Sequence, residues 1–173
     1  MNIILLGYRG TGKSVISRTL AQKLKRKLIP IDKEIARSAG MPISQIVQQW
    51  GWPRFREIES RIIREVSAKE CEAVIDCGGG VVLDDQNIAC LKKQGRTALL
   101  RADLQTLMKR IKNDPNRPPL KEGLSFEEEQ KIIMAEREPK YLSAADMICD
   151  TTSKKPVATA REIIEFFQMK SWI

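Results

Sequence analysis

The chain of 173 residues contains no histidine, and this absence removes several kinds of active site. Without an imidazole there can be no Ser-His or Cys-His nucleophile and no zinc site with a histidine ligand. Acid–base chemistry must therefore depend on carboxylates, lysine, tyrosine, cysteine or bound water. The four cysteines include no CxxC pair, so we expect reduced thiols and neither a zinc knuckle nor a thioredoxin-like site.

Long apolar runs and aromatic residues are scarce as well. No run approaches the roughly 20 apolar residues that cross a bilayer, and the start, MNIILLGYRG, has neither a basic n-region nor a cleavage site. We therefore expect a cytoplasmic protein that does not bind a membrane. The net charge of +8 favours an anionic partner, namely nucleic acid, anionic lipid or a phosphorylated small molecule. Because aromatic residues make up only 5% and no basic stripe is interleaved with them, we expect no nucleic acid as partner.

Short apolar runs alternate with longer amphipathic segments along the whole chain. The runs predict strands at residues 2–6, 28–31, 73–75, 97–100 and 147–149. Helical spacing predicts helices at residues 12–25, 54–69, 84–93, 104–112, 126–142 and 157–167. Such alternation is typical of an α/β fold in which a parallel sheet carries helices on both faces and binds ligands at the carboxyl ends of its strands. Since no linker, repeat or low-complexity segment interrupts the pattern, we expect one domain over residues 1–173.

One motif carries most of the chemistry. Gly7-Tyr8-Arg9-Gly10-Thr11-Gly12-Lys13-Ser14 fits GxxxxGK[ST], follows an apolar strand and opens an amphipathic helix. Glycines there let backbone N–H groups approach phosphate oxygens, and the helix N-terminus adds partial positive charge. Lys13 can reach the β- and γ-phosphates, and Ser14 can ligate Mg²⁺. We therefore predict nucleotide binding, rather than a mere tight turn before a helix.

Three carboxylates follow predicted strands. Asp32 and Glu34 come at the end of the second strand, where they could serve a metal's water shell or orient an acceptor hydroxyl. The alternative is an N-cap at Asp32 and a helix-favourable Glu34 in the first turn. Asp76 ends the third strand before three glycines, so it is Walker-B-like and could serve the magnesium shell; otherwise the glycines form a flexible turn.

The segment 113–123 stands apart because it has three prolines, a glycine and several charges between two helical patterns. It fits either a plain surface loop or a mobile lid that carries Arg117 over a site.

Taken together, the ordered motifs resemble the shikimate kinase family, a branch of the P-loop proteins similar to nucleoside-monophosphate kinases. The likeness extends from Asn2 to about Phe167. Besides the P-loop and the acidic pair, it rests on five segments. These are Ile43-Ser44-Gln45-Ile46-Val47 leading to Gly51, Phe55-Arg56-Glu57-Ile58-Glu59 (the family's FRxxE segment), Gly78-Gly79-Gly80, Asn116-Arg117-Pro118-Pro119-Leu120 and Arg137-Glu138-Pro139-Lys140-Tyr141 (its RxPxY segment).

The resemblance implies a three-layer sandwich of the P-loop NTPase type, with a five-stranded parallel sheet, a substrate-binding helical region and a lid near residues 112–124. It also implies Mg²⁺-dependent transfer of the ATP γ-phosphoryl group to the 3-hydroxyl of shikimate, a step of aromatic amino-acid biosynthesis by way of chorismate.

The same resemblance implies roles for individual residues. ATP binding would involve Gly10, Thr11, Gly12, Lys13, Ser14, Arg110, Arg117 and Lys154. Ser14 and Asp32 would serve the metal, whereas Glu34, Arg56, Gly79 and Arg137 would bind shikimate, the arginines through its carboxylate. Lys13, Glu34 and Arg117 would be catalytic.

The chain departs from the family pattern at two of these motifs. The acidic pair is Asp32-Lys33-Glu34 where the family usually has Asp-x-Asp, and Trp52 stands where the family commonly has an acid. Two other activities therefore stay open, a related P-loop kinase for an acceptor such as gluconate and an ATP-binding regulatory module without catalysis. We expect a monomer, since no apolar patch or coiled-coil seam is evident.

Overall fold

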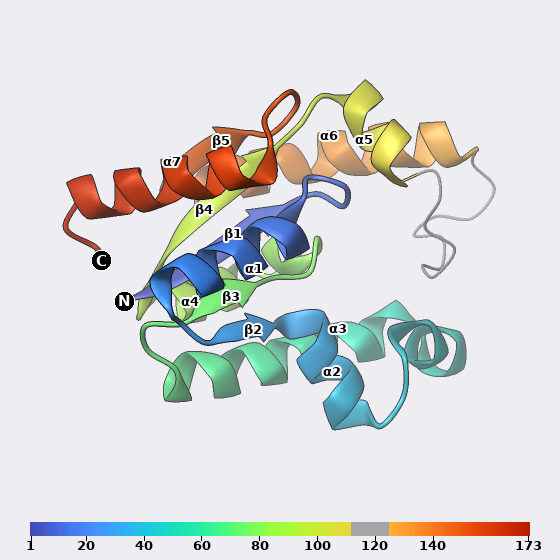
Figure 1. The fold of residues 1–173 in the computed structure, drawn as a ribbon. Helices are drawn as coiled ribbons and strands as arrows, with labels where there is room; N and C mark the ends of the chain where they lie inside the picture. Colours follow the sequence, from blue (N-terminus) through green and yellow to red (C-terminus); the bar gives the residue numbers. More distant parts are fainter. Residues whose placement is uncertain (112–124) are drawn as a thin grey trace.

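The runs of apolar and β-branched residues form a five-stranded sheet in the computed structural model, which describes residues 1–111 and 125–173 (Figure 1). The strands are β1 (Asn2–Gly7), β2 (Leu28–Pro30), β3 (Val74–Asp76), β4 (Gly95–Arg101) and β5 (Met147–Asp150). They pair in the order β2-β3-β1-β4-β5, and every pairing is parallel. The five predicted strands are thus confirmed, and their carboxyl ends meet at one edge. The expected lid, with Arg117, lies outside the described residues.

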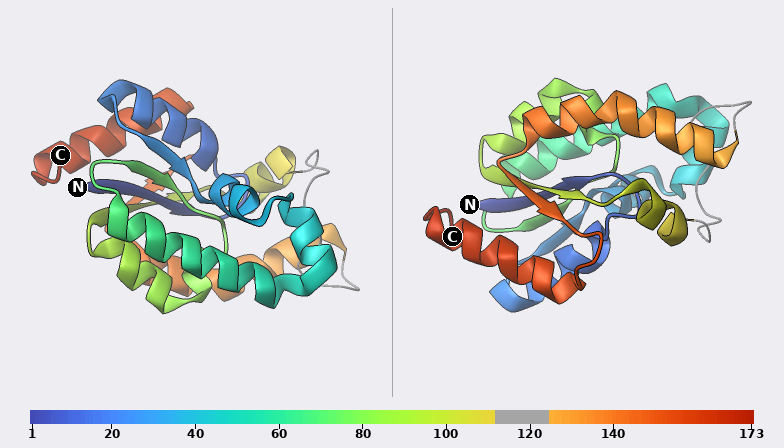
Figure 2. Two further views of the ribbon diagram at one scale, coloured as in Figure 1. Left: turned by 90° about the horizontal axis from the view of Figure 1, so that it is seen from below. Right: turned by 90° about the horizontal axis from the view of Figure 1, so that it is seen from above.

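Helices cover both faces of this sheet. They are α1 (Lys13–Leu24), α2 (Ile31–Ala39), α3 (Ile43–Lys69), α4 (Asp85–Lys92), α5 (Leu104–Ile111), α6 (Phe126–Ala144) and α7 (Pro156–Met169), with a short 3-10 helix, η1 (Val81–Leu83). Helices α1 and α7 lie on one face, and α3, α4 and α6 on the other (Figure 2). The predicted three-layer α/β sandwich is therefore confirmed.

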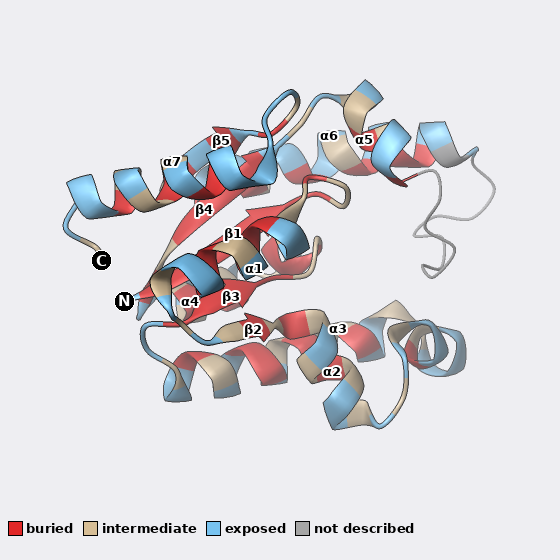
Figure 3. Ribbon diagram, viewed as in Figure 1, coloured by how far each residue is buried: buried red, intermediate tan, exposed pale blue. Residues whose placement is uncertain are grey.

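The central strand β1 shows why the layers form. Ile3 and Leu5 pack against α1 and α7, whereas Ile4 and Leu6 pack toward α3 and α6. All four side chains are fully buried, as expected for a strand that is covered on both faces (Figure 3).

Two helical segments were not predicted from the sequence. Helix α2 has only two buried residues, Ile31 and Ile35, which is too short a pattern to show a helical period. Helix α3 begins eleven residues earlier than expected, at Ile43 rather than residue 54, and is interrupted at Gly51, where φ is 76° and ψ is 173°. A left-handed φ suits glycine, so this break lets the two helical segments meet at an angle.

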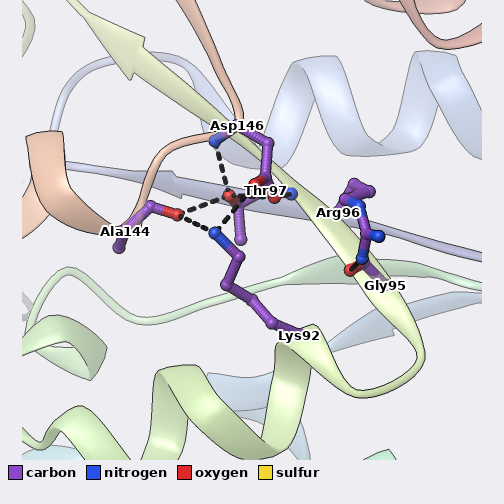
Figure 4. A network of polar contacts seen from close by, with 6 residues as sticks. All are labelled: Lys92, Gly95, Arg96, Thr97, Ala144 and Asp146. Carbon is purple, nitrogen blue, oxygen red and sulfur yellow. Dashed lines mark hydrogen bonds and ion pairs between the residues drawn. The ribbon is translucent and has the colours of Figure 1, made fainter. Parts of the chain in front are cut away.

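A polar network links β4 and β5 near their amino ends, away from the carboxyl edge of the sheet (Figure 4). The Asp146 carboxylate lies 2.8 Å from the Lys92 ammonium and accepts hydrogen bonds from the backbone and hydroxyl of Thr97, both at 2.9 Å. The Thr97 hydroxyl also contacts the Ala144 carbonyl at 2.6 Å. Burial alone would raise the pKa of Asp146, but these hydrogen bonds and the Lys92 charge outweigh it and hold that pKa below its ordinary value.

Candidate active site

The GxxxxGK[ST] motif forms the loop between β1 and α1, as its spacing requires. Gly10 and Gly12 have φ values of 80° and 90°, which a side chain would disfavour. Thr11 is buried, and its hydroxyl donates to the Tyr8 carbonyl at 2.7 Å. The Lys13 ammonium lies 2.8 Å from the Gly7 carbonyl and therefore stays over the loop. Because the first turn of α1 carries no acidic residue, its N-terminus keeps a positive potential for phosphates.

This loop opens into a cleft of about 680 Å³ at the carboxyl edge of the sheet. A volume of this size lies within the range of small-molecule binding sites. The cleft brings together Gly10, Gly12, Lys13, Ser14, Asp32, Gly79 and Arg110 from the expected site, and it adds Ser17 and Asp76.

The two acidic side chains among the described residues of the cleft come from different elements. Asp76 is the last residue of β3 and is only 8% exposed. Burial raises its pKa, while the Lys13 charge and hydrogen bonds with Ser14 and Ser17 oppose that rise. Asp32 lies in the first turn of α2. The cleft therefore combines a phosphate-binding loop with carboxylates at separate positions.

Glu34 does not lie in this cleft, contrary to what we expected for a catalytic residue. Its carboxylate pairs with Arg37 and lines a second groove between β2, α2 and α3. Successive residues of an α-helix are rotated by about 100°, so positions 32 and 34 face nearly opposite sides of α2. No helix range was predicted here, but the structure supports the alternative in which Glu34 lies in the first turn of a helix, with Pro30 rather than Asp32 as the N-cap.

The turn that follows β3 brings the expected substrate residues together. An ideal Cβ on Gly78 would lie 2.8 Å from Asp32 Oδ1, and one on Gly80 would overlap the Arg56 guanidinium. The Arg137 guanidinium donates to the Gly79 carbonyl at 3.0 Å. Each of the three glycines thus lies against a different functional side chain, which leaves little room for a larger residue at either end.

Glu59 and Tyr141 belong to this cluster as well, and neither was predicted as a site residue from the sequence. The Glu59 side chain is fully buried and pairs with Arg56, and the Tyr141 hydroxyl donates to the Gly79 carbonyl. Burial raises the pKa of Glu59, and the adjacent Arg56 charge and hydrogen bond oppose it. Burial likewise raises the pKa of Tyr141, so its phenol stays protonated. Glu59 is the last residue of the FRxxE segment and Tyr141 the last residue of the RxPxY segment, so the sequence contained a signal for both.

Aromatic rings also fix the Arg56 side chain. Its guanidinium carbon lies 4.9 Å from the Phe55 ring centre and 5.7 Å from that of Trp52. Cation–π contacts of this kind restrict the guanidinium. Trp52 therefore packs beside a substrate-site residue and forms an edge-to-face pair with Phe55.

The two expected adenine-side residues differ in position. The Arg110 guanidinium donates to the Thr151 carbonyl at 2.8 Å and to the Gly10 carbonyl at 3.2 Å, so it joins the P-loop to the segment after β5. Lys154 pairs with Glu162 at 2.6 Å and is not among the described residues that line the cleft.

The donor atoms of the cleft suit a hard cation that arrives with a nucleotide. Within residues 1–111 and 125–173, no group of three or more His, Cys, Asp or Glu side chains could hold a metal ion. Ser14, Asp32 and Asp76 nevertheless offer oxygen atoms, which Mg²⁺ prefers when phosphates complete its coordination. No helix in the described part of the chain is long and apolar enough to cross a membrane.

Known proteins resemble this chain over almost its whole length. A family model described as shikimate kinase matches residues 9–168. Shikimate kinase from Pelotomaculum thermopropionicum is 38% identical, with 99% of this chain and 98% of that protein covered. Shikimate kinase from Thermodesulfovibrio yellowstonii is also 38% identical, with 98% and 96% covered. Among solved structures, shikimate kinase from Acinetobacter baumannii in complex with shikimate matches with a TM-score of 0.91 and 28% identity, over 98% of this chain and 93% of that one.

Proposed function

The chain belongs to the shikimate kinase family, and we propose that it transfers the γ-phosphoryl group of ATP to the 3-hydroxyl of shikimate. One observation carries the proposal: the Arg56 and Arg137 guanidinium groups both lie against the glycine turn that borders the phosphate cleft, Arg56 at Gly80 and Arg137 at Gly79. A carboxylate-binding pair beside a phosphate-binding loop suits an acceptor that bears both a carboxylate and a hydroxyl. The A. baumannii relative was solved with shikimate bound, which supports the same acceptor here.

For the acceptor, we propose that the two arginines bind the shikimate carboxylate, together with Gly79. Arginine forks suit a carboxylate because they donate two parallel hydrogen bonds. Asp32 lines the cleft beside Gly78, so we propose that it binds the acceptor hydroxyl, which is the role that we expected for Glu34. As a carboxylate at this edge, Asp32 orients that hydroxyl and can accept its proton.

For ATP, the P-loop from Gly10 to Ser14 supplies backbone N–H groups, and Lys13 supplies a charge for the β- and γ-phosphates. Arg110 lies beside this loop and serves the adenine side. Lys154 is proposed for the same side, and Arg117, outside the described residues, is proposed to act over the phosphates. Positioning and charge neutralisation then supply most of the rate enhancement.

Mg²⁺ fits this cleft through the Ser14 hydroxyl and an aspartate, with ATP phosphates as further ligands. When bound, the ion neutralises charge on the transferred phosphoryl group. The chain's own part is to keep Ser14 at the first turn of α1, next to Lys13.

We further propose that residues 1–173 form one kinase domain, with a lid near residues 112–124, and that it acts as a cytoplasmic monomer. A single continuous sheet with helices on both faces supports one domain.

A coupled assay of ADP release with Mg-ATP tests the activity, with shikimate, gluconate and no acceptor compared side by side. We expect release that depends on shikimate. ADP release with gluconate alone would support a P-loop kinase but refute shikimate as its acceptor. If protein that binds ATP shows no acceptor-dependent release, the activity is refuted in favour of a nucleotide-binding module.

A further inference from the structure

The two aspartates of the cleft have different neighbours, and this difference separates their roles. Asp76 lines the cleft together with Lys13, Ser14 and Ser17. Burial raises its pKa, the Lys13 charge and hydrogen bonds with Ser14 and Ser17 lower it, and the charge of Asp32 across the cleft raises it. The Ser17 hydroxyl lies 3.4 Å from Asp76 Oδ2. Ser14 and Ser17 are three residues apart on α1, so both hydroxyls project from the same face of that helix.

Strand pairing holds Asp76 in this position. It lies opposite Leu5 of β1, just before the P-loop begins, and opposite Pro30 of β2 on its other side. Pro30 has no side-chain oxygen, so the last residue of β2 offers no side-chain ligand to a metal ion. The backbone of Asp76 is part of a central strand, so its carboxylate is presented by a rigid element.

Asp32 lies on the acceptor side instead. Its Oδ1 is beside Gly78, where the fully buried Glu59 also approaches. Glu59 pairs with Arg56, the proposed ligand of the acceptor carboxylate. Asp32 therefore lies beside the acceptor cluster, whereas Asp76 contacts Ser17 of α1 and lines the cleft together with Ser14.

In P-loop proteins, Mg²⁺ is held by the P-loop Ser or Thr together with an aspartate at the end of a neighbouring strand. We propose that Asp76, with Ser14, holds the magnesium ion of the bound nucleotide, and that Ser17 positions the Asp76 carboxylate. This replaces the expectation that Asp32 serves the metal and leaves Asp32 for the acceptor hydroxyl. This proposal rests on one part of the proposed function, namely that the cleft binds a nucleotide together with its metal ion, and it does not depend on the acceptor.

The test measures binding of Mn²⁺, a paramagnetic substitute for Mg²⁺, to the complex of protein and ADP by electron paramagnetic resonance. Asp76→Asn keeps the shape of the side chain and removes its charge, and Asp32→Asn is the matched control from the same cleft. We expect Asp76→Asn to weaken Mn²⁺ binding by about 10- to 100-fold. Affinity for ADP in EDTA should stay at the wild-type value, which also shows that the variant is folded.

Asp32→Asn should keep the Mn²⁺ affinity and instead weaken shikimate binding. Loss of Mn²⁺ binding in Asp32→Asn alone, or equal loss in both variants, overturns the inference. Unchanged Mn²⁺ binding in Asp76→Asn overturns it too.

Ser17 gives a second route that keeps the aspartate in place. We expect Ser17→Ala to weaken Mn²⁺ binding and Ser17→Thr, which retains the hydroxyl, to restore it. Equal Mn²⁺ affinity in both Ser17 variants and the wild type would overturn the positioning role. The Mn²⁺ and ADP measurements that decide the role of Asp76 do not need the acceptor, so a wild-type protein that binds Mn²⁺ and ADP without shikimate-dependent turnover would refute the proposed function separately.

Discussion

Replacement of Arg56 by alanine should destabilise the fold as well as weaken shikimate binding, because it leaves the Glu59 carboxylate buried without its partner. The Glu59 side chain is fully buried, whereas that of Arg56 is 26% exposed. Removal of one member of a buried ion pair costs about 3–5 kcal/mol, and we expect about 3 kcal/mol here because water reaches part of the guanidinium. Lost contacts with the Trp52 and Phe55 rings contribute to that total.

The loss should depend on pH. Burial raises the pKa of Glu59 above its ordinary value even with Arg56 present, and loss of the Arg56 charge raises it further. A carboxyl group with a raised folded-state pKa lowers stability as pH rises from its unfolded pKa through the folded one. The deficit of Arg56→Ala should therefore be largest at neutral pH and smaller near pH ~5, where Glu59 gains a proton more readily.

Urea denaturation of the wild type and two variants, at both pH values, measures these free energies of unfolding. Arg54→Ala is the control, because Arg54 pairs with Glu57 at the same spacing on the same helix, with side chains 58% and 65% exposed. An exposed pair of this kind contributes about 0–1 kcal/mol. Equal losses in Arg56→Ala and Arg54→Ala, or a deficit that does not shrink at the lower pH, would refute the reasoning.

Three other substitutions probe separate parts of the molecule. Gly80 has an ordinary backbone conformation, with φ at −110°, so alanine is tolerated by the backbone at this position. Its Cβ would displace the Arg56 guanidinium by roughly 1 Å, so kcat/KM for shikimate should fall about 10²-fold in Gly80→Ala. An equal rise in the KM for ATP would contradict a specific effect on the shikimate site. Asp146→Asn removes the ion pair with Lys92 and should lower the free energy of unfolding by about 1–2 kcal/mol at neutral pH. Since the folded-state pKa of Asp146 is lowered, this difference should vanish in denaturation curves as pH falls through that value, and a constant difference would count against it. Lys13→Met should reduce kcat by about 10²-fold or more with an unchanged circular dichroism spectrum, and near-normal turnover would exclude Lys13 from catalysis.

Much of the fold follows from local patterns in the sequence. Each strand is a short apolar run, and the GxxxxGK[ST] motif by itself specifies a strand, a phosphate-binding turn and a helix start. The α2 helix was missed because it has only two buried positions, Ile31 and Ile35. The first part of α3 was missed as well, and the left-handed Gly51 separates it from the remainder.

The sequence by itself also determined the family and the residue types of the site, since motifs such as FRxxE and the glycine run are local in the chain. Only the tertiary structure decided which carboxylates reach the cleft. The rotation of α2 turns Asp32 inward and Glu34 toward Arg37, and that rotation depends on where the helix begins and how it packs. The sheet order puts β3 beside β1 and so brings Asp76 to Ser17, 59 residues earlier in the chain. Such contacts are set by packing between distant elements, which no local pattern in the sequence encodes.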